Sequence, residues 1–236
     1  MMGKLFRKFK KSHLEKAILD LNKKDIKFIQ IGACDGESFD PIFKLIKNNK
    51  WQGVLVEPIP RYFNKLKDNY KNSKGLHFVN KAIGNGNDKV TMYTISEEGL
   101  NFLPKWTIGI SSIRDDKNAL SESYWKTEDA KQHIKRGVTY ELIKKYTEAI
   151  EVDSIRFMDL LDEFEIKDLD LLQIDAEGFD FEIIKQIDFD KIVPKIIHFE
   201  FNSLTETEKK ECKKLLENNG YKFSFYSKMD ALAIKN

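Results

Sequence analysis

The stretch Phe28-Ile29-Gln30-Ile31-Gly32-Ala33-Cys34-Asp35-Gly36 decides the fold, because an apolar run there ends in a glycine-rich turn. A second apolar run, Gly53 to Val56, ends in a single carboxylate, Glu57. In an open α/β sheet, such glycines let the backbone approach a cofactor, and the acid accepts the ribose hydroxyls. The spacing is G-x-x-x-G, unlike the G-x-G-x-x-G of nicotinamide and flavin sites, where the backbone also approaches a pyrophosphate. The pattern therefore indicates a cofactor with a ribose and no pyrophosphate, of which S-adenosylmethionine is the usual one.

Strand and helix patterns alternate along most of the chain, which predicts a doubly wound α/β fold. The run from Leu169 to Asp175 is almost entirely apolar, as a parallel strand buried on both faces should be. A hairpin predicted from Tyr221–Tyr226 and Ala231–Ile234 gives the mostly parallel sheet an antiparallel C-terminal edge. The other predicted strands are Lys27–Ile31, Gly53–Val56, Leu76–Asn80, Lys89–Ile95 and Lys195–Phe201, and the predicted helices are Ser38–Asn48, Pro60–Tyr70, Phe179–Ile187 and Glu206–Asn218.

Length and composition fit one globular domain with an ordinary core. The chain has 236 residues, of which 41% are hydrophobic and 33% charged. Its 40 basic and 38 acidic residues leave a net charge of +2, so no strong field predicts a nucleic-acid partner. Two cysteines, Cys34 and Cys212, are too few for a disulfide framework and indicate the reducing cytoplasm. No apolar run reaches the roughly 18 residues that a transmembrane helix needs.

Residues 1–25 are predicted to form a basic helical segment ahead of the main domain, residues 26–236. Apolar residues recur there at helical spacing between lysines, at Leu5, Phe6, Phe9, Leu14, Ile18 and Leu21. We favour a helix that packs this apolar side on the domain. The alternative is a helix that docks on a partner or makes a weak peripheral contact with a membrane surface, as basic amphipathic segments do.

The segment from about residue 96 to residue 150 interrupts the alternation of strands and helices. It is rich in aromatic residues and carries a basic cluster, Lys131, Lys135 and Arg136. Thr127 to Thr147 is predicted as one polar helix. Because an insertion at this point lies on the carboxyl-end side of the sheet, where ligands bind, we expect it to be a substrate lid. The alternative is a surface excursion whose tryptophans only anchor it to the core.

Four chemically active side chains belong to two predicted strands: Asp175, Glu177, His198 and Glu200. Asp175 and Glu177 are predicted on one side of a strand that ends at Gly178, and His198 and Glu200 on one side of the next. If these strands are parallel neighbours, the four groups meet at one sheet edge. Carboxylates forced together raise each other's pKa, which suits a general base, and they also suit a hard divalent cation. We expect the base and no metal. In the competing interpretation, His198 is structural and each glutamate caps a helix or holds a loop.

Five blocks of the sequence together resemble the FkbM-type methyltransferases: Ile29–Gly36, Glu57-Pro58, Asn80–Gly84, Val152–Ile155 and Leu171–Gly178. The most specific is the D-x-E-G sequence within the last block, and the match runs from about residue 26 to residue 234 without much of the insertion. The resemblance implies a class I, Rossmann-like fold with a seven-stranded sheet and an inserted cap. It also implies O-methylation with S-adenosylmethionine, commonly of a sugar or polyketide hydroxyl.

The resemblance assigns cofactor contacts by position in this sequence. The methionine part of the cofactor would border Gly32, Ala33, Asp35 and Gly36. The ribose would contact Glu57, with Pro58 beside it, and the adenine would contact Lys81 and Ala82. Asp175 would lie near the methyl group. His198 stands where family members mostly have an aliphatic residue.

We therefore expect methyl transfer to a hydroxyl of a small molecule, such as a sugar, nucleotide sugar or glycan. The candidate bases or hydroxyl-orienting groups are Asp175, Glu177, His198 and Glu200. Two alternatives stay open: an NAD- or nucleotide-sugar-binding enzyme on a similar sheet, and a protein of this fold that binds without catalysis. The cofactor that the purified protein retains would distinguish them.

Overall fold

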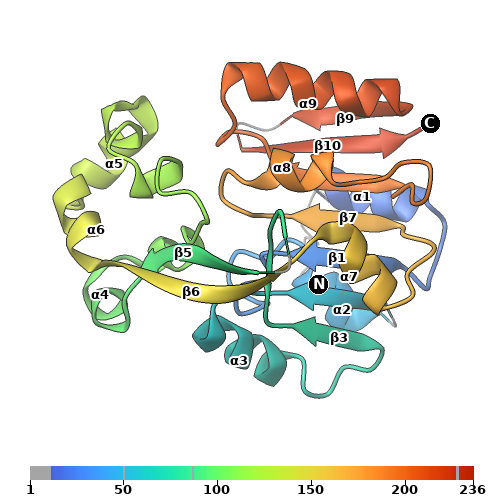
Figure 1. Cartoon of the computed structure of the whole chain (residues 1–236), viewed down its shortest axis with the longest axis horizontal. Helices are drawn as coiled ribbons and strands as arrows, with labels where there is room; N and C mark the ends of the chain where they lie inside the picture. The colour runs from blue at the N-terminus through green and yellow to red at the C-terminus, as the bar shows by residue number, and fades with distance from the viewer. Residues whose placement is uncertain (1–11, 50, 87, 227–228) are drawn as a thin grey trace, which may run out of the picture.

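The computed structural model describes residues 12–49, 51–86, 88–226 and 229–236. Its centre is a seven-stranded sheet, parallel except for the C-terminal strands, as predicted (Figure 1). Across the sheet, the order of the strands is β3 (Leu76–Val79), β2 (Gln52–Val56), β1 (Lys27–Ile31), β7 (Leu171–Ile174), β8 (Ile196–Glu200), β10 (Asp230–Lys235) and β9 (Tyr221–Tyr226). The strand β10 runs antiparallel to both of its neighbours, which confirms the predicted antiparallel edge.

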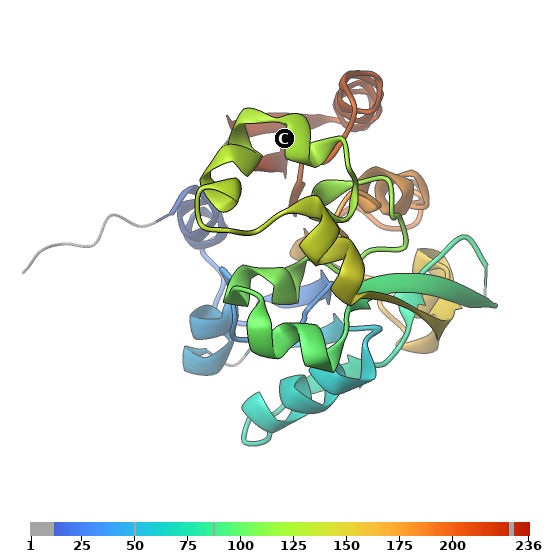
Figure 2. The same cartoon turned by 90° about the vertical axis from the view of Figure 1, so that its left-hand side faces the viewer.

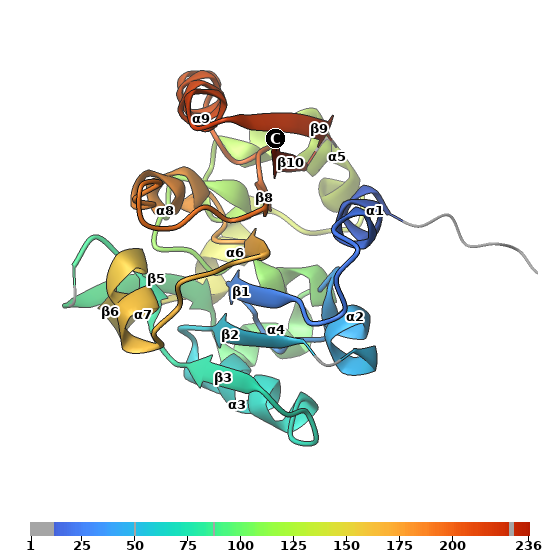
Figure 3. The same ribbon diagram turned by 90° about the vertical axis from the view of Figure 1, so that its right-hand side faces the viewer.

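Alternating side chains of these strands feed two separate hydrophobic cores. In β1, Phe28 packs on one face with α1 (His13–Asp20), α2 (Phe43–Asn48) and α3 (Pro60–Asn69). Ile29 and Ile31 point to the other face, which α7 (Phe157–Glu163), α8 (Asp180–Lys185) and α9 (Glu206–Asn218) cover. Figure 3 shows these two helical layers on opposite sides of the sheet. Burial on both faces explains why the central strands are apolar without interruption.

The strand order reverses between β1 and β7. The chain builds outward from β1 through β2 to β3, and then returns to place β7 on the other side of β1. The register aligns Ile31 with both Val56 and Ile174, so the carboxyl ends of three strands finish at one level. A switch point of this kind leaves a crevice between the loops that leave the two central strands, and ligands bind there.

A second, three-stranded sheet carries the insertion. It consists of β4 (Ala82–Ile83), β6 (Thr147–Ile155) and β5 (Lys89–Ile95), with β5 and β6 paired as a long antiparallel ribbon. Residues 96–146, which we call the cap, connect these two strands at the end of the ribbon (Figure 1). At its neck, the Ser96 amide donates to the Tyr146 carbonyl at 2.7 Å. Figure 2 shows the cap lying across the carboxyl ends of the sheet.

The cap has a hydrophobic core of its own. Trp125, Leu120, Ile143 and Val138 pack together there, and the Trp125 indole donates to the Ala119 carbonyl at 2.9 Å. Its elements are α4 (Glu97–Phe102), α5 (Glu128–Ile134), α6 (Tyr140–Tyr146) and three short 3₁₀ helices, η1 (Lys105–Gly109), η2 (Asn118–Leu120) and η3 (Tyr124–Lys126). Trp125 therefore packs within the hydrophobic core of the cap and not against the main core.

Two predicted helices differ from the structure because of local turn chemistry. The helix expected from Ser38 begins only at Phe43, because Asp35 accepts hydrogen bonds from the Glu37 and Ser38 amides and Phe39 has a φ of +61°. The single helix expected over Thr127–Thr147 is two helices, α5 and α6. Gly137, with a φ of +80°, ends the first, and the Thr139 side chain caps the second.

The strand boundary before the D-x-E-G block also differs from the prediction. The strand β7 ends at Ile174, so Asp175 and Glu177 lie in the following loop and not on one side of a strand. Glu177 has a φ of +51°, which an extended strand excludes. The strand β6 and the helix α7 that follows it are additional elements, which the sequence patterns did not predict.

The helix α1 buries Leu14, Ala17 and Ile18 on the domain, as we favoured for the N-terminal segment. A capping box between Ser12 and Glu15 starts this helix. The predicted apolar positions Leu5, Phe6 and Phe9 lie outside the described residues. None of the described helices combines the length and apolarity required to cross a bilayer.

Replacing Gly32 by alanine should destabilise the fold by about 3 kcal/mol or more. A Cβ at Gly32 would overlap the Asp175 carbonyl oxygen, and the φ of +76° is strained for any side chain. The control is Gly137→Ala, which has a similar φ of +80° but no atom within 4 Å of the added Cβ, and should lose only about 1–2 kcal/mol. Urea unfolding of both variants measures the difference, and equal losses would contradict a close approach at Gly32.

Candidate functional site

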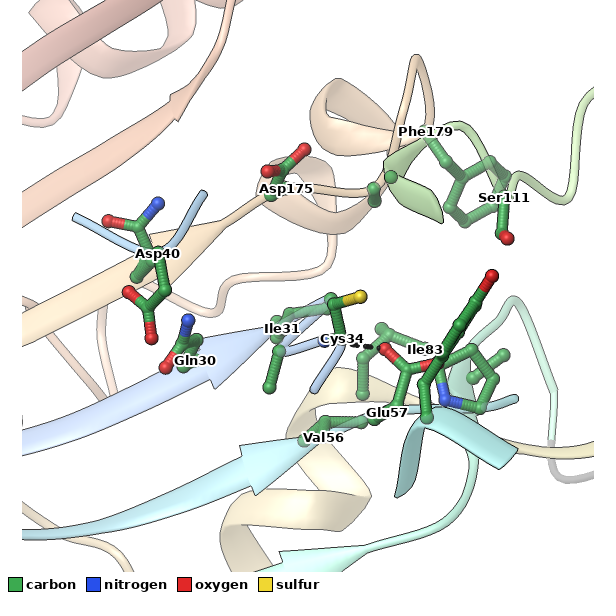
Figure 4. Close-up of a pocket in the computed structure, with 18 of the residues that line it drawn as sticks. Gln30, Ile31, Cys34, Asp40, Val56, Glu57, Ile83, Ser111, Asp175 and Phe179 are labelled. Atoms are coloured by element: carbon green, nitrogen blue, oxygen red, sulfur yellow. Dashed lines mark hydrogen bonds between the residues drawn. The ribbon is translucent and has the colours of Figure 1, made fainter. Parts of the chain in front are cut away.

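A pocket opens at the switch point, between the loops that follow β1, β2 and β7. Figure 4 shows Cys34, Glu57 and Asp175 following these three strands around the cavity. Of the residues predicted to contact a cofactor, those that line this pocket are Gly32, Ala33, Glu57, Pro58, Ala82 and Asp175. The cap contributes to the same wall with Ile108, Gly109, Ser111 and Ile113.

Three of the predicted cofactor residues lie elsewhere. Asp35 shapes the turn, where its carboxylate accepts from the Ser38 amide and hydroxyl, both at 2.7 Å. Gly36 packs against Leu66 and Tyr70, which leave no room for a side chain there. Lys81 forms an ion pair with Glu163 at 3.4 Å, at the edge of the second sheet. None of the three lines the pocket, and their assignment to the cofactor stays a prediction.

Glu57 is almost fully buried in the pocket wall. Its Oε2 accepts a hydrogen bond from the Cys34 amide, and its Oε1 accepts one from the Ile59 amide, both at 2.8 Å. Burial raises the pKa of Glu57 to about 7, against the lowering effect of these two hydrogen bonds. A carboxylate accepts about four hydrogen bonds, so the two amides leave capacity for ligand hydroxyls.

Several polar atoms in the pocket wall are buried without a hydrogen-bond partner. They are Gln30 Oε1, Asp40 Oδ2 and the Tyr62 hydroxyl. An unsatisfied buried polar group costs about 1–3 kcal/mol, so such atoms are rare in folded proteins unless a ligand or water completes them. Gln30 and Asp40 lie at one end of the cavity, whereas Ile83, Ser111 and Phe179 lie at the other (Figure 4). The pocket therefore has a polar end and a mostly apolar end.

The pocket wall is negatively charged. It contains the carboxylates of Asp40, Glu57 and Asp175, and no lysine or arginine is among the described residues that line it. Burial raises the pKa of Asp40 to about 6, and burial together with the nearby carboxylate of Asp180 raises the pKa of Asp175 to about 7. Such a wall favours a cationic ligand and opposes a pyrophosphate.

Asp175 also belongs to a cluster of carboxylates with Glu177 and Glu200. One oxygen from each of the three lies within 4.8 Å of the others. This confirms that the carboxylates after β7 and at the end of β8 converge. Burial and the facing carboxylates raise the pKa of Glu177 and of Glu200 well above the usual range for glutamate.

The buried Asp180 holds the cluster in place. Its Oδ1 accepts from the Glu200 amide at 3.1 Å, and its Oδ2 accepts from the Gly178 amide at 3.3 Å. A single carboxylate thereby joins the end of β8 to the loop after β7. Burial raises the pKa of Asp180 to about 6. Its role is to position the other acids.

His198 is not part of this cluster. Its Nδ1 forms a hydrogen bond of 2.8 Å with Gln173 Oε1 on the neighbouring strand, and burial lowers the pKa of its imidazole. Gln173 in turn lines the switch-point pocket. The assignment of His198 to catalysis stays a prediction.

A second and wider pocket of about 730 Å³ lies between the cap and the ends of β8 and α9. Glu177 and Glu200 line it, so the acid cluster joins this pocket to the first through Asp175. On the cap side, the rings of Trp106 and His133 approach to 4.3 Å between centroids, with Tyr124 close to His133. We call this the cap pocket.

The cap contacts the acid cluster directly. Asn118 donates to Glu177 Oε2 at 2.8 Å, and the Ser112 hydroxyl donates to the Glu177 carbonyl at 2.9 Å. Lys117 forms an ion pair with Glu208 on α9 at 2.9 Å and packs its stem over Gly178, where an added Cβ would lie 2.8 Å from it. Gly178 is thus required for the close seating of the cap.

Comparison with known proteins identifies the family. Residues 30–223 match the protein family described as "Methyltransferase FkbM domain". The chain belongs to the FkbM methyltransferase family. Its seven-stranded, mostly parallel sheet with an antiparallel edge is the class I methyltransferase fold. A comparison with curated proteins gave no match.

Similar solved structures are other methyltransferases. One is precorrin-6y C5,15-methyltransferase from Geobacter metallireducens, at 14% identity over 94% of this chain and 87% of that chain, with a TM-score of 0.42. Another is the N-terminal domain of human METTL16 in complex with SAH, at 14% identity over 94% of this chain and 66% of that one, with a TM-score of 0.45. A third is ribosomal protein L11 methylase from Lactobacillus delbrueckii subsp. bulgaricus, at 8% identity over 94% and 77%, with a TM-score of 0.41.

Sequence reasoning missed several residues of this FkbM-family site. The sequence pattern could have identified Gln30, because it is a polar residue inside an otherwise apolar strand, where an amide needs a hydrogen-bond partner. Asp40 and Tyr62 belong to segments whose pattern is that of an ordinary surface helix, so no local pattern singles them out. Asn118 and Asp180 act through contacts that only the folded chain makes.

Replacing Asp40 by asparagine should make stability less dependent on pH. Burial raises the pKa of Asp40 from 3.8 to about 6, so the folded state binds this proton more tightly than the unfolded state. Stability is therefore lost as the pH rises from about 4 to 6. Because asparagine cannot ionise, the variant should gain about 1–2 kcal/mol over the wild type at pH 8 relative to pH 4.

Urea unfolding at the two pH values measures this gain for Asp40→Asn. The other buried acids are present in both proteins, so their contribution cancels in the comparison. An identical stability difference at pH 4 and pH 8 would contradict a raised pKa for Asp40.

Proposed function

We propose that this FkbM-family protein transfers a methyl group from S-adenosylmethionine to a hydroxyl of a small molecule, most simply a sugar or glycan. The observation that carries the proposal is the charge of the switch-point pocket, whose wall holds Asp40, Glu57 and Asp175 and no described basic residue. S-adenosylmethionine carries a net positive charge, since its sulfonium and ammonium outweigh one carboxylate. The cofactor, when bound, supplies an electrophilic sulfonium methyl.

The residues of the pocket fit this cofactor chemically. Glu57 has unused acceptor capacity for ribose hydroxyls beside its two amide hydrogen bonds. The unpartnered atoms of Gln30 and Asp40 suit the ammonium group of the methionine part. The apolar end, with Ile83 and Phe179, suits the adenine ring. The proposal thus uses the buried polar atoms that the protein alone leaves unsatisfied.

The cap pocket is the proposed acceptor site. Carbohydrates present apolar ring faces to aromatic side chains and hydroxyls to carboxylates, and this pocket offers both kinds of group. Trp106 and Tyr124 come from the cap, and Glu177 and Glu200 come from the sheet. Its position beside the cofactor pocket supports the cap as a substrate lid.

The acid cluster supplies the proposed chemistry at the acceptor. Asp175, Glu177 and Glu200 would orient the acceptor hydroxyl and receive its proton. Their raised pKa values favour carboxylates that take up a proton near neutral pH. Orientation alone contributes on the order of 7 kcal/mol in well-aligned cases, so a mainly positional role is sufficient for a reactive sulfonium.

An NAD- or nucleotide-sugar-dependent enzyme is the weaker alternative. A pyrophosphate is bound where a glycine turn leads directly into a helix N-terminus. Here the helix α2 begins only at Phe43, well beyond the Gly32 turn, and three carboxylates line the pocket. The free cysteines Cys34 and Cys212 support our proposal that the protein works in the reducing cytoplasm.

Calorimetric titration with S-adenosylmethionine, and with NAD in parallel, tests the cofactor. We expect the first to bind and the second not to bind. Replacing Tyr62 by phenylalanine should weaken S-adenosylmethionine about 2- to 10-fold through the loss of one hydrogen bond, without loss of stability, because the hydroxyl has no partner in the protein.

The matched control for Tyr62→Phe is Tyr70→Phe, at the end of the same helix. The Tyr70 hydroxyl donates to the Gly36 carbonyl at 3.4 Å and is not in the pocket wall, so this change should reduce stability and leave affinity unchanged. Binding of NAD in preference to S-adenosylmethionine would refute the proposed function.

Replacing Trp106 by alanine should raise the acceptor KM about 10-fold or more, because an aromatic ring that stacks on the acceptor is lost. The affinity for S-adenosylmethionine should not change, since Trp106 lines the cap pocket alone. Transfer of labelled methyl to a panel of neutral pyranosides measures the effect. The control is Phe102→Ala, an exposed aromatic of the cap outside the pocket. A fall in kcat with unchanged KM would place the acceptor elsewhere.

A further inference from the structure

The three carboxylates of the acid cluster have the spacing of ligands to one ion. Two oxygens on opposite sides of a cation are separated by twice the metal–oxygen distance, which is about 4–5 Å for Mg²⁺ or Ca²⁺. The oxygens of Asp175, Glu177 and Glu200 lie within 4.8 Å of one another. One cation can therefore reach all three without movement of the backbone.

Glu200 gives an independent indication of a missing partner. Its side chain is 8% exposed, and its Oε2 has no hydrogen-bond partner. A buried carboxylate oxygen in this state is costly, because burial disfavours the charge and this oxygen accepts no hydrogen bond that would offset it. The carboxylate belongs to the cluster, so a cation bound there would satisfy it.

The described basic side chains around the cluster do not neutralise it. None of the three carboxylates forms an ion pair with a described lysine or arginine. In the wall of the cap pocket, Arg114 pairs with Asp116 at 2.7 Å, and Lys117 pairs with Glu208 at 2.9 Å. The direct contact from the cap is the neutral amide of Asn118 on Glu177. The cluster therefore has no cationic partner among the described side chains.

The cluster is also held rigidly, as a metal site requires. Asp180 fixes both the Glu200 and the Gly178 amides, and Asn118 fixes the Glu177 carboxylate. Partners of this kind orient the ligands of metal sites. The backbone at Glu200 and Gly178 and the Glu177 carboxylate are thus held in place before any ion binds.

We propose that Asp175, Glu177 and Glu200 bind one divalent cation of the Mg²⁺, Mn²⁺ or Ca²⁺ type at the junction of the two pockets. Three protein oxygens leave other coordination positions free, and the cap pocket opens onto them. These positions take a pair of neighbouring hydroxyl oxygens of the acceptor, an assignment that rests on the proposed function. The inference replaces our expectation from the sequence that no metal takes part.

The cation would act on the acceptor and not on the cofactor. With the three carboxylates bound to the cation, the proton of the acceptor hydroxyl goes to water and not to them. A hydroxyl bound to a divalent cation has a lowered pKa and loses this proton more readily. Its oxygen then forms the bond to the methyl carbon as the bond from that carbon to sulfur breaks, and sulfur keeps the electron pair. Two bound hydroxyls would also fix which oxygen faces the cofactor.

Manganese binding to the full chain tests the site without cofactor or acceptor. The protein is treated with chelator and desalted, and free Mn²⁺ is then followed by electron paramagnetic resonance during titration. We expect one ion per chain with a dissociation constant on the order of 10⁻⁵ to 10⁻³ M, and competition by Mg²⁺ or Ca²⁺. Glu200→Gln and Glu177→Gln should each weaken binding at least tenfold.

The control is Asp153→Asn, which removes one acidic group from a different, shallow hollow. It should bind Mn²⁺ like the wild type. Thermal unfolding verifies that each variant is folded. If one of the two glutamate variants does not fold, the other still tests the site. Absence of saturable binding, or equal binding by the wild type and the folded glutamate variants, would overturn the proposal. Because S-adenosylmethionine is absent here, a failed metal site and a failed cofactor assignment give separate results.

Discussion

The close approach of the loops after β1 and β7 is the constraint on which the rest of the site depends. Gly32 lies against the Asp175 carbonyl, and the Asp175 amide donates to the Ile31 carbonyl at 2.9 Å. Because no side chain fits between them, the glycine turn and the D-x-E-G block border one cavity. A glycine at this position is usually explained by the space that a cofactor needs. Here Gly32 is required, first of all, because two backbone segments meet at it.

Several buried carboxylates, whose charge is costly to remove from water, lie around this cavity and the acid cluster beside it. Glu57 and Asp180 are each held by two backbone amides, so their burial is largely compensated within the protein. Asp40 and Glu200 each keep an oxygen without a partner. The difference separates acids that build the site from acids that await a ligand. Carboxylate oxygens without a partner favour cations, and both proposed occupants, a sulfonium and a divalent ion, are cationic.

The sequence predicted the features that depend on local patterns. Apolar strand runs that alternate with helical patterns predicted the sheet, and the final hairpin predicted its antiparallel edge. The strand ends placed Glu57 and Asp175 around one pocket. It could not predict contacts between distant segments, such as that of Asn118 with Glu177, since nothing near either residue encodes the other. The resemblance placed Lys81 at the adenine by its position in the chain, but Lys81 pairs with Glu163 and does not line the switch-point pocket.

The cap links the two halves of the proposed reaction through a few contacts. Asn118 and Ser112 both donate hydrogen bonds to Glu177, which belongs to the acid cluster and also lines the cap pocket. Glu177 has a φ of +51°, an unfavourable backbone conformation for a glutamate, whereas its partner Asn118, at +45°, is of a residue type that tolerates this region. Such strain persists only where the surrounding structure enforces it. Here the contacts from the cap enforce it on the D-x-E-G loop, so a change in the position of the cap would alter the geometry of the acid cluster directly.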